Sequence, residues 1–132
     1  MIITKELLDN LSAEARGNER LRKNFDLRNS EGDQSQRMLN ALEPGTEIPI
    51  HRHMDSSEIV TIVRGSICEK FYDEKGELIE EITLQFGKGI PMLVVPKGMW
   101  HNLECLESGT IIYESKDGAY QPTRPDDIME KK

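Results

Sequence analysis

Hydrophobic positions near the N-terminus recur with a helical period. The apolar residues spaced by one, three and four positions are Leu7, Leu8, Leu11 and Ala15. Such spacing predicts an α-helix with one apolar face, and Thr4 is suited to its N-cap because a threonine hydroxyl can accept hydrogen bonds from the first turn. Gly17 and Asn18 are a natural end. We therefore expect a helix from Thr4 to about Arg16 that packs on a larger unit.

From Gln36 onward the pattern changes to short β-type runs separated by turn residues such as Pro44-Gly45, Lys75-Gly76 and Lys97-Gly98. The runs predict strands near residues 36–42, 48–53, 58–64, 66–73, 77–84, 91–95, 100–106 and 109–115. About eight short strands with no helical pattern between them indicate an antiparallel sandwich or barrel. The polar segment after Tyr120 contains two prolines, so we expect an extended end of the chain.

A chain of 132 residues fits one domain. We divide it into a helix with its connecting segment (1–35), a β-barrel (36–120) and a polar tail (121–132). The net charge of −7 argues against a nucleic-acid partner, which normally requires a basic face. No apolar run is long enough to span a bilayer. Two distant cysteines and an N-terminus that becomes charged early predict a cytoplasmic protein with free thiols.

The three histidines of the chain are its most informative residues. His51 and His53 are separated by one residue, so in a strand both imidazoles point to the same face. Glu58 follows a predicted turn, and His101 follows the turn-forming segment from Pro96 to Trp100. Three imidazoles and one carboxylate suit one divalent transition metal, namely Fe, Mn, Ni, Zn or Cu, with one or two positions open. A His-x-His pair alone is weak evidence, since most such pairs are solvated or packed.

The spacing of these residues is more specific than the residues themselves. Gly45, His51-Arg52-His53, Glu58 and Gly65 form one segment, and Pro96-Lys97-Gly98-Met99-Trp100-His101 forms a second. This arrangement resembles the two-part motif of the cupin superfamily. The resemblance implies a double-stranded β-helix, or jelly-roll, barrel that is mainly β with one N-terminal helix. It also implies that His51, His53, Glu58 and His101 are metal ligands. Cupins often form homodimers, so a homodimer is expected by analogy.

A closer resemblance extends over most of the chain. The segments that carry it are residues 36–46, residues 48–53, residues 95–101 and the stretch from Leu106 to Pro122. They are similar to the WbuC family of cupin fold metalloproteins. Members of that family resemble bacterial cytoplasmic proteins linked to surface-polysaccharide (O-antigen) gene clusters. The resemblance implies a metal site and a sugar-related context, but it implies no particular reaction, and the catalytic residues stay unknown.

Arg37 and Asn40 are the residues we expect to contact a ligand. Five of the eight arginines lie between Arg16 and Arg37, and most of them are expected on a solvated, locally paired face. Arg37 lies within a β run, where a charge needs a partner or a ligand, so it either faces the pocket or forms a buried ion pair. The predicted partner is a small, anionic, sugar-related molecule. Two functions remain open: a metal-dependent enzyme, and a non-catalytic module that binds or senses a small ligand.

Overall fold

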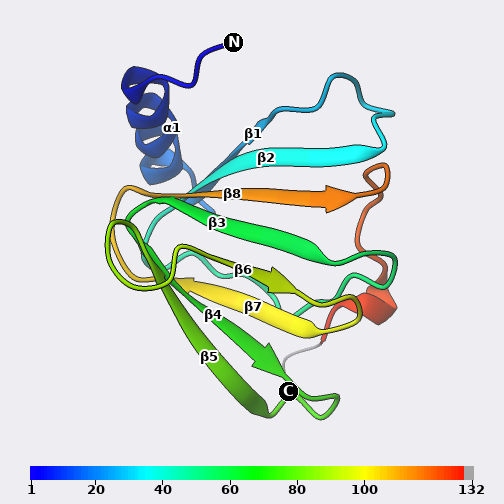
Figure 1. Cartoon of the computed structure of the whole chain (residues 1–132). Helices are drawn as coiled ribbons and strands as arrows, with labels where there is room; N and C mark the ends of the chain where they lie inside the picture. The colour runs from blue at the N-terminus through cyan, green and yellow to red at the C-terminus, as the bar shows by residue number, and fades with distance from the viewer. Residues whose placement is uncertain (130–132) are drawn as a thin grey trace.

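Strands are the main regular elements in the computed structural model, which describes residues 1–129. The elements in chain order are α1 (Lys5–Gly17), β1 (Arg22–Asp26), β2 (Ser35–Leu42), β3 (Glu58–Arg64), β4 (Ser66–Tyr72), β5 (Leu78–Gln85), β6 (Met92–Val95), β7 (Trp100–Cys105), β8 (Thr110–Asp117) and the short 3-10 helix η1 (Pro125–Asp127). The sheets have the strand orders β1-β2-β8-β3-β6 and β5-β4-β7. All strand pairs within them are antiparallel, and Figure 1 shows the two sheets with α1 at one end. The predicted mainly-β fold is therefore confirmed.

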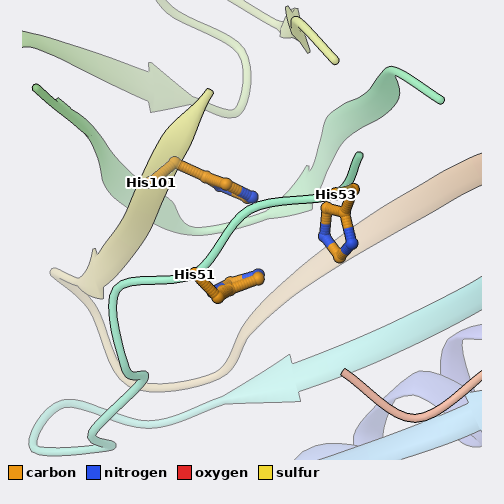
Figure 2. A group of neighbouring side chains, drawn as sticks. All are labelled: His51, His53 and His101. Atoms are coloured by element: carbon orange, nitrogen blue, oxygen red, sulfur yellow. The ribbon is translucent and has the colours of Figure 1, made fainter. Parts of the chain in front are cut away.

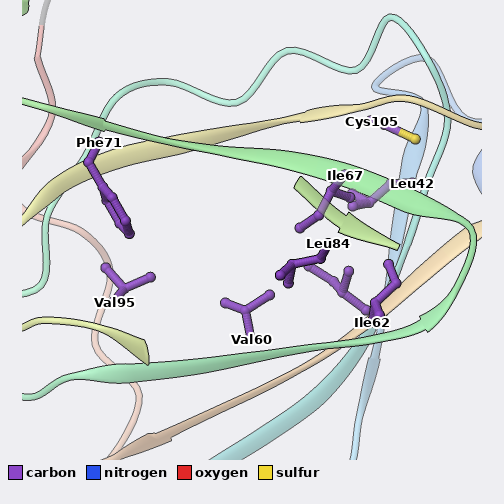
Figure 3. Close-up of a cluster of buried hydrophobic side chains, with 9 residues drawn as sticks. Leu42, Val60, Ile62, Ile67, Phe71, Leu84, Val95 and Cys105 are labelled. Carbon is purple, nitrogen blue, oxygen red and sulfur yellow. The ribbon is translucent and has the colours of Figure 1, made fainter. Parts of the chain in front are cut away.

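The apolar core lies between the two sheets (Figure 3). Its buried members are Leu42, Val60, Ile62, Ile67, Phe71, Leu84, Val95, Cys105 and Ile112. Alternate residues of one strand reach this core, because successive side chains of a strand point to opposite faces. On β3, for example, Val60 and Ile62 are buried inside while Ile59 is exposed outside.

A second, smaller core joins α1 to the outer face of the larger sheet. The Thr4 hydroxyl accepts a hydrogen bond from the Leu7 amide at 3.1 Å, which confirms the predicted N-cap. The buried residues of this core are Leu11, Ala15, Leu39, Ala41 and Ile111. On β2 the odd-numbered residues therefore face the helix, and the even-numbered residues face the barrel interior.

One predicted strand is absent, and one observed strand was not predicted. Residues 48–53 do not form a regular strand, because Pro49 lacks an amide proton and the segment pairs only through isolated bridges, from His51 to His101 and to Ile128. The strand β1 was missed. Its sequence, Arg-Lys-Asn-Phe-Asp, holds a single apolar residue, because β1 is the outermost strand of its sheet and lacks an apolar inward face.

The C-terminal segment lies over one end of the barrel, beside the loop that carries His51 and His53 (Figure 1). The Arg52 amide donates to the Asp127 carbonyl at 3.0 Å, and the Arg52 side chain donates to the Asp127 carboxylate at 2.9 Å. The Met129 amide donates to the Ile50 carbonyl. Of the polar tail expected at 121–132, residues 121–129 are thus attached to the barrel, and 130–132 lie outside the described residues. No helix among residues 1–129 is long and apolar enough to cross a membrane.

Candidate metal centre

A short backbone ladder brings two of the three histidines together. The His51 amide donates to the His101 carbonyl at 3.0 Å, and the His101 amide donates back to the His51 carbonyl at 2.8 Å. The two rings lie on the same side of this bridge, with centroids 4.4 Å apart. The loop that replaces the expected strand therefore still places His51 beside His101, the second residue of β7. A single antiparallel pair is enough to set this register.

His53 completes the cluster from the same loop. The Gly98 amide donates to the His53 carbonyl at 2.7 Å, which holds the loop against the turn before β7. Figure 2 shows the three rings directed toward one another from β7 and from this loop. One ligand nitrogen from each of His51, His53 and His101 lies within 4.8 Å of the other two. Two atoms that both bind a metal at about 2.1 Å are at most about 4.2 Å apart, so a movement of less than about 1 Å would close the set around one ion.

Glu58 adds the carboxylate that the sequence predicts. It is the first residue of β3, it is buried, and its Oε2 lies 3.2 Å from His53 Nε2. Two ligand atoms at right angles around a metal are separated by about 3 Å, which matches this distance. Glu58 lines both cavities beside the histidines, but within residues 1–129 the group whose ligand atoms all lie within 4.8 Å of one another comprises the three histidines without Glu58.

Each imidazole is neutral at physiological pH and is oriented by a partner. Burial lowers the pKa of His51 to about 3 and the pKa values of His53 and His101 to about 4. His51 Nδ1 donates to the Pro49 carbonyl at 2.9 Å, and His101 Nδ1 lies 2.6 Å from Glu69 Oε1. The Pro49 carbonyl can only accept, so the lone pair of His51 lies on Nε2, which is the form that binds a metal; an ionised Glu69 carboxylate has the same effect on His101.

His53 has a different neighbour on its second nitrogen. The Lys116 ammonium lies 3.1 Å from His53 Nδ1, and its charge contributes, after burial, to the lowered pKa of this histidine. A cation bound at Nε2 puts the imidazole proton on Nδ1, where Lys116 can no longer donate. Lys116 is therefore the neighbour whose contact has to change if His53 binds through Nε2.

The hydrogen-bond inventory of the site fits a bound cation. Buried polar atoms normally have a partner, and an exception indicates a missing ion, water or ligand. His53 Nε2 and His101 Nε2 are both buried without a hydrogen bond, as is Glu69 Oε2. The donor set, rich in imidazole nitrogen with a carboxylate, suits the divalent transition metals predicted from the sequence.

Two further carboxylates lie in the site and were missed by sequence reasoning. Glu69 on β4 is 1% exposed and contacts His101, and burial raises the pKa of its carboxyl well above the usual range. Glu114 on β8 accepts a hydrogen bond from the Asn40 amide at 3.2 Å. Burial and the charge of Glu58 raise the pKa of Glu114 to about 8. A signal in the sequence was available for both. Glu69 lies two residues after the core residue Ile67, and Glu114 lies two residues after the core residue Ile112, so each glutamate faces inward like its isoleucine.

Two cavities meet at the metal centre. The larger, of about 300 Å³, is lined by His51, Glu58, His101, Glu69 and other residues that include Arg20, Arg22 and Asn40. The smaller, of about 140 Å³, shares His51 and Glu58 with it and extends past His53 toward Tyr120. The larger cavity reaches the lower end of the volumes typical of small-molecule sites, about 300–1,000 Å³.

The two residues predicted to contact a ligand differ in position. Asn40 lies on an inward position of β2, and its side chain lines the larger cavity. Arg37 shares the parity of Leu39 and Ala41, which face the helix, and it forms a salt bridge with Asp33 at 2.8 Å. Arg37 also contributes to the lining of the smaller cavity. Its role toward a ligand stays a prediction.

Comparison with solved structures places the chain among cupin-fold proteins. The capsular polysaccharide assembling protein CapF from Staphylococcus aureus shares 21% identity at a TM-score of 0.67, over 85% of this chain and 32% of that chain. Oxalate decarboxylase from Bacillus subtilis shares 19% identity at a TM-score of 0.58, over 83% and 27%. A cupin-2 domain containing protein from Shewanella frigidimarina shares 27% identity at a TM-score of 0.53, over 70% and 79%.

The chain thus spans about a third of CapF and about a quarter of oxalate decarboxylase. No curated protein matches its sequence. One family model, described as a domain of unknown function (DUF6016), matches residues 3–84, a stretch that includes α1, His51, His53 and Glu58. This stretch covers more than half of the chain, and so the protein, which has the cupin fold, belongs to the DUF6016 family.

Proposed function

We propose that this protein is a metal-dependent cupin in which His51, His53, Glu58 and His101 hold one divalent transition metal. The observation that carries the proposal is the convergence of three neutral imidazoles, two of which have a buried Nε2 that forms no hydrogen bond. Oxalate decarboxylase, which shares the fold, has Mn(II) centres. Iron, manganese, nickel, zinc and copper all accept this donor set.

The proposed ligand is a small, anionic, sugar-related molecule. Three neutral imidazoles and one carboxylate leave a divalent ion with a net charge of about +1, which attracts oxygen anions. The bound ion would supply Lewis acidity to an oxygen of that ligand. Asn40 lies beside the larger cavity and can hydrogen-bond a hydroxyl, while Arg37 can approach a ligand only from the smaller cavity.

A role in surface-polysaccharide (O-antigen) biosynthesis is the context we favour. The WbuC-type segments of the sequence support it, and so does the fold shared with CapF, a capsular polysaccharide assembling protein. We place the protein in the cytoplasm, with a homodimer as its functional form. The exposed apolar side chains of Ile59, Met92 and Val94 on neighbouring strands β3 and β6 support a homodimer contact, and gel filtration with light scattering tests it.

The metal proposal is tested by elemental analysis of protein purified without a histidine tag. We expect about one transition-metal ion per chain in the parent protein and loss of that ion in His51→Ala and His101→Ala. The control is Glu104→Gln, which removes an exposed carboxylate from β7, the strand that carries His101. Full metal occupancy in both histidine variants, or loss in the control as well, contradicts the proposed site.

A further inference from the structure

We infer that Arg20 and Arg22 form an anion-binding subsite in the larger cavity, opposite the metal centre. The inference rests on the proposed metal site and specifies its ligand. That ligand is a small hydroxy acid with a second anionic group, a carboxylate or a phosphate, at the end away from the metal. Both arginines line the cavity that also contains His51, Glu58 and His101.

The register of β1 shows why Arg22 reaches the cavity. In an antiparallel pair, directly opposite residues project to the same face. Arg22 lies opposite Leu42, which is part of the core between the sheets, and Asn24 lies opposite Asn40, which lines the cavity. Phe25, on the alternate position, packs against the helix-side core. The inward face of β1 therefore presents an arginine and an asparagine to the cavity.

Arg20 and Arg22 are not paired with an acidic side chain, although Glu58, Glu69 and Glu114 line the same cavity. Five other arginines each pair with an aspartate: Arg28, Arg37, Arg52, Arg64 and Arg124. Within residues 1–129, neither Arg20 nor Arg22 forms a salt bridge. The Arg22 guanidinium donates to the Glu47 carbonyl, and burial, followed by the charge of Arg20, lowers the pKa of Arg22. Two neighbouring guanidinium groups of like charge are stabilised by an anion bound between them.

The backbone that carries the two arginines is firmly held. Leu21, between them, has a φ of 56°, a left-handed conformation that is uncommon outside glycine. The Thr46 hydroxyl donates to the Arg20 carbonyl at 2.7 Å, and the Glu43 amide donates to the Leu21 carbonyl at 3.0 Å. Strained residues persist where surrounding contacts fix them, and they concentrate at ligand sites.

The chemistry of the cavity defines the ligand from both ends. A metal held by imidazoles binds a carboxylate with an adjacent hydroxyl, because hard oxygen donors complete its coordination. Guanidinium groups bind carboxylate or phosphate through two parallel hydrogen bonds. One molecule that spans the cavity can therefore contact the metal and the arginine pair together.

Matched ligand pairs test this inference by calorimetric titration of the manganese-loaded protein. Malate differs from lactate by one carboxylate, and 3-phosphoglycerate differs from glycerate by one phosphate. We expect malate, 3-phosphoglycerate or both to bind ten times more tightly than the partner that lacks the second anionic group, and the pair that shows the difference identifies that group. We expect the double variant Arg20→Gln/Arg22→Gln to lose that difference, with unchanged affinity for manganese and for the monoanions.

Two further variants keep the test decisive. Arg20→Gln alone changes an exposed side chain, so it keeps the fold and is expected to lose part of the tenfold preference. Arg16→Gln removes the same charge from α1, and its preference should equal that of the parent. The inference is overturned if neither malate nor 3-phosphoglycerate binds the parent protein more tightly than its partner ligand. It is also overturned if the difference in affinity survives in the double variant. Failure of the parent protein to bind manganese or another transition metal instead contradicts the proposed function.

Discussion

On β3, β7 and β8, inward-facing positions change from apolar to ionisable toward the end of the barrel covered by the C-terminal segment. On β3 the change is from Val60 to Glu58, and on β8 it is from Ile112 to Glu114. On β7, His101 has the same parity as the core residue Cys105. The same strands thus build two interiors, one apolar and one polar, with the same alternation of side chains.

The two interiors contribute differently to the protein. The side chains of the apolar interior pack against one another and need no other partner, and their burial favours the folded state in proportion to the buried area. The polar interior contains unpartnered nitrogen and oxygen atoms, and burial displaces the pKa values of its acids and imidazoles. Such groups reduce stability unless they are paired or bind a cation. The apolar interior therefore stabilises the fold, and the polar interior is organised for a ligand.

The largest expected effect is a loss of stability from the apolar interior. Ile67→Ala removes a side chain that is 0% exposed in the core, and it should lower the free energy of unfolding by about 2–5 kcal/mol. Metal affinity of the folded protein should stay unchanged, because Ile67 does not line the metal cavities. Urea titration and chelator competition measure the two quantities.

Ile79→Ala is the matched control for this prediction. Ile79 lies on β5 and is 58% exposed, so the same change should alter stability by less than about 0.5 kcal/mol. Equal losses in the two variants would contradict the division into an apolar core and a separate site.

The apolar interior was the more predictable from the sequence. Alternating residues located β2, β3 and β4 within one residue, because each has one face in a core. The strand β1 escaped detection for the opposite reason. It is an edge strand whose inward residues, Arg22 and Asn24, contact a cavity, so no apolar period marks it. Composition alone cannot distinguish such a strand from a polar loop.

The polar interior was predictable only where a motif supported it. The spacing of His51, His53 and His101 anticipated a cluster that the structure assembles, although a loop and one bridge replace the expected strand. Glu69 was missed because a single glutamate in a strand carries no spacing signal. The arginines that reach the larger cavity could not be identified from the sequence. Their direction depends on the pairing of β1 with β2, and this register is known only from the structure.

The next effect is a dependence of stability on pH that comes from the polar interior. The Glu114 pKa of about 8 in the folded protein lies above its ordinary value of 4.5, so the folded state binds more protons between these values. The resulting stability is present below pH 4.5 and is lost as pH rises through about 8. Unfolded histidines, with a pKa of about 6.5, oppose this trend near neutral pH, because all three histidines are neutral in the folded protein. Between pH 6.5 and 8 the contribution of Glu114 to the stability of the metal-free protein should fall by about 1.6 kcal/mol.

Glu114→Gln isolates this contribution. The variant has no proton to release at position 114, so it should lack this loss, and the difference in stability between parent and variant should change by about 1.6 kcal/mol over the same range. Urea titrations of the metal-free parent and variant at pH 6.5 and pH 8 measure the difference. A stability difference between parent and variant that is the same at both pH values would show that Glu114 is ionised in the folded state.

The smallest effect concerns the contact between Glu69 on β4 and His101 on β7, two neighbouring strands of the smaller sheet. Glu69 Oε1 lies 2.6 Å from His101 Nδ1, which fixes the ring and leaves Nε2 free to bind a metal. Glu69→Gln keeps the shape but weakens the acceptor, so metal affinity should fall about tenfold, equivalent to about 1.4 kcal/mol. Chelator competition measures the affinity, and the visible spectrum of the cobalt-substituted protein reports whether the ligand geometry has changed.

Glu104→Gln, on the exposed face of β7, should leave both readouts unchanged. If Glu69→Gln binds metal as tightly as the parent, the carboxylate does not position His101, and the backbone bridge between His51 and His101 is sufficient to orient the ring.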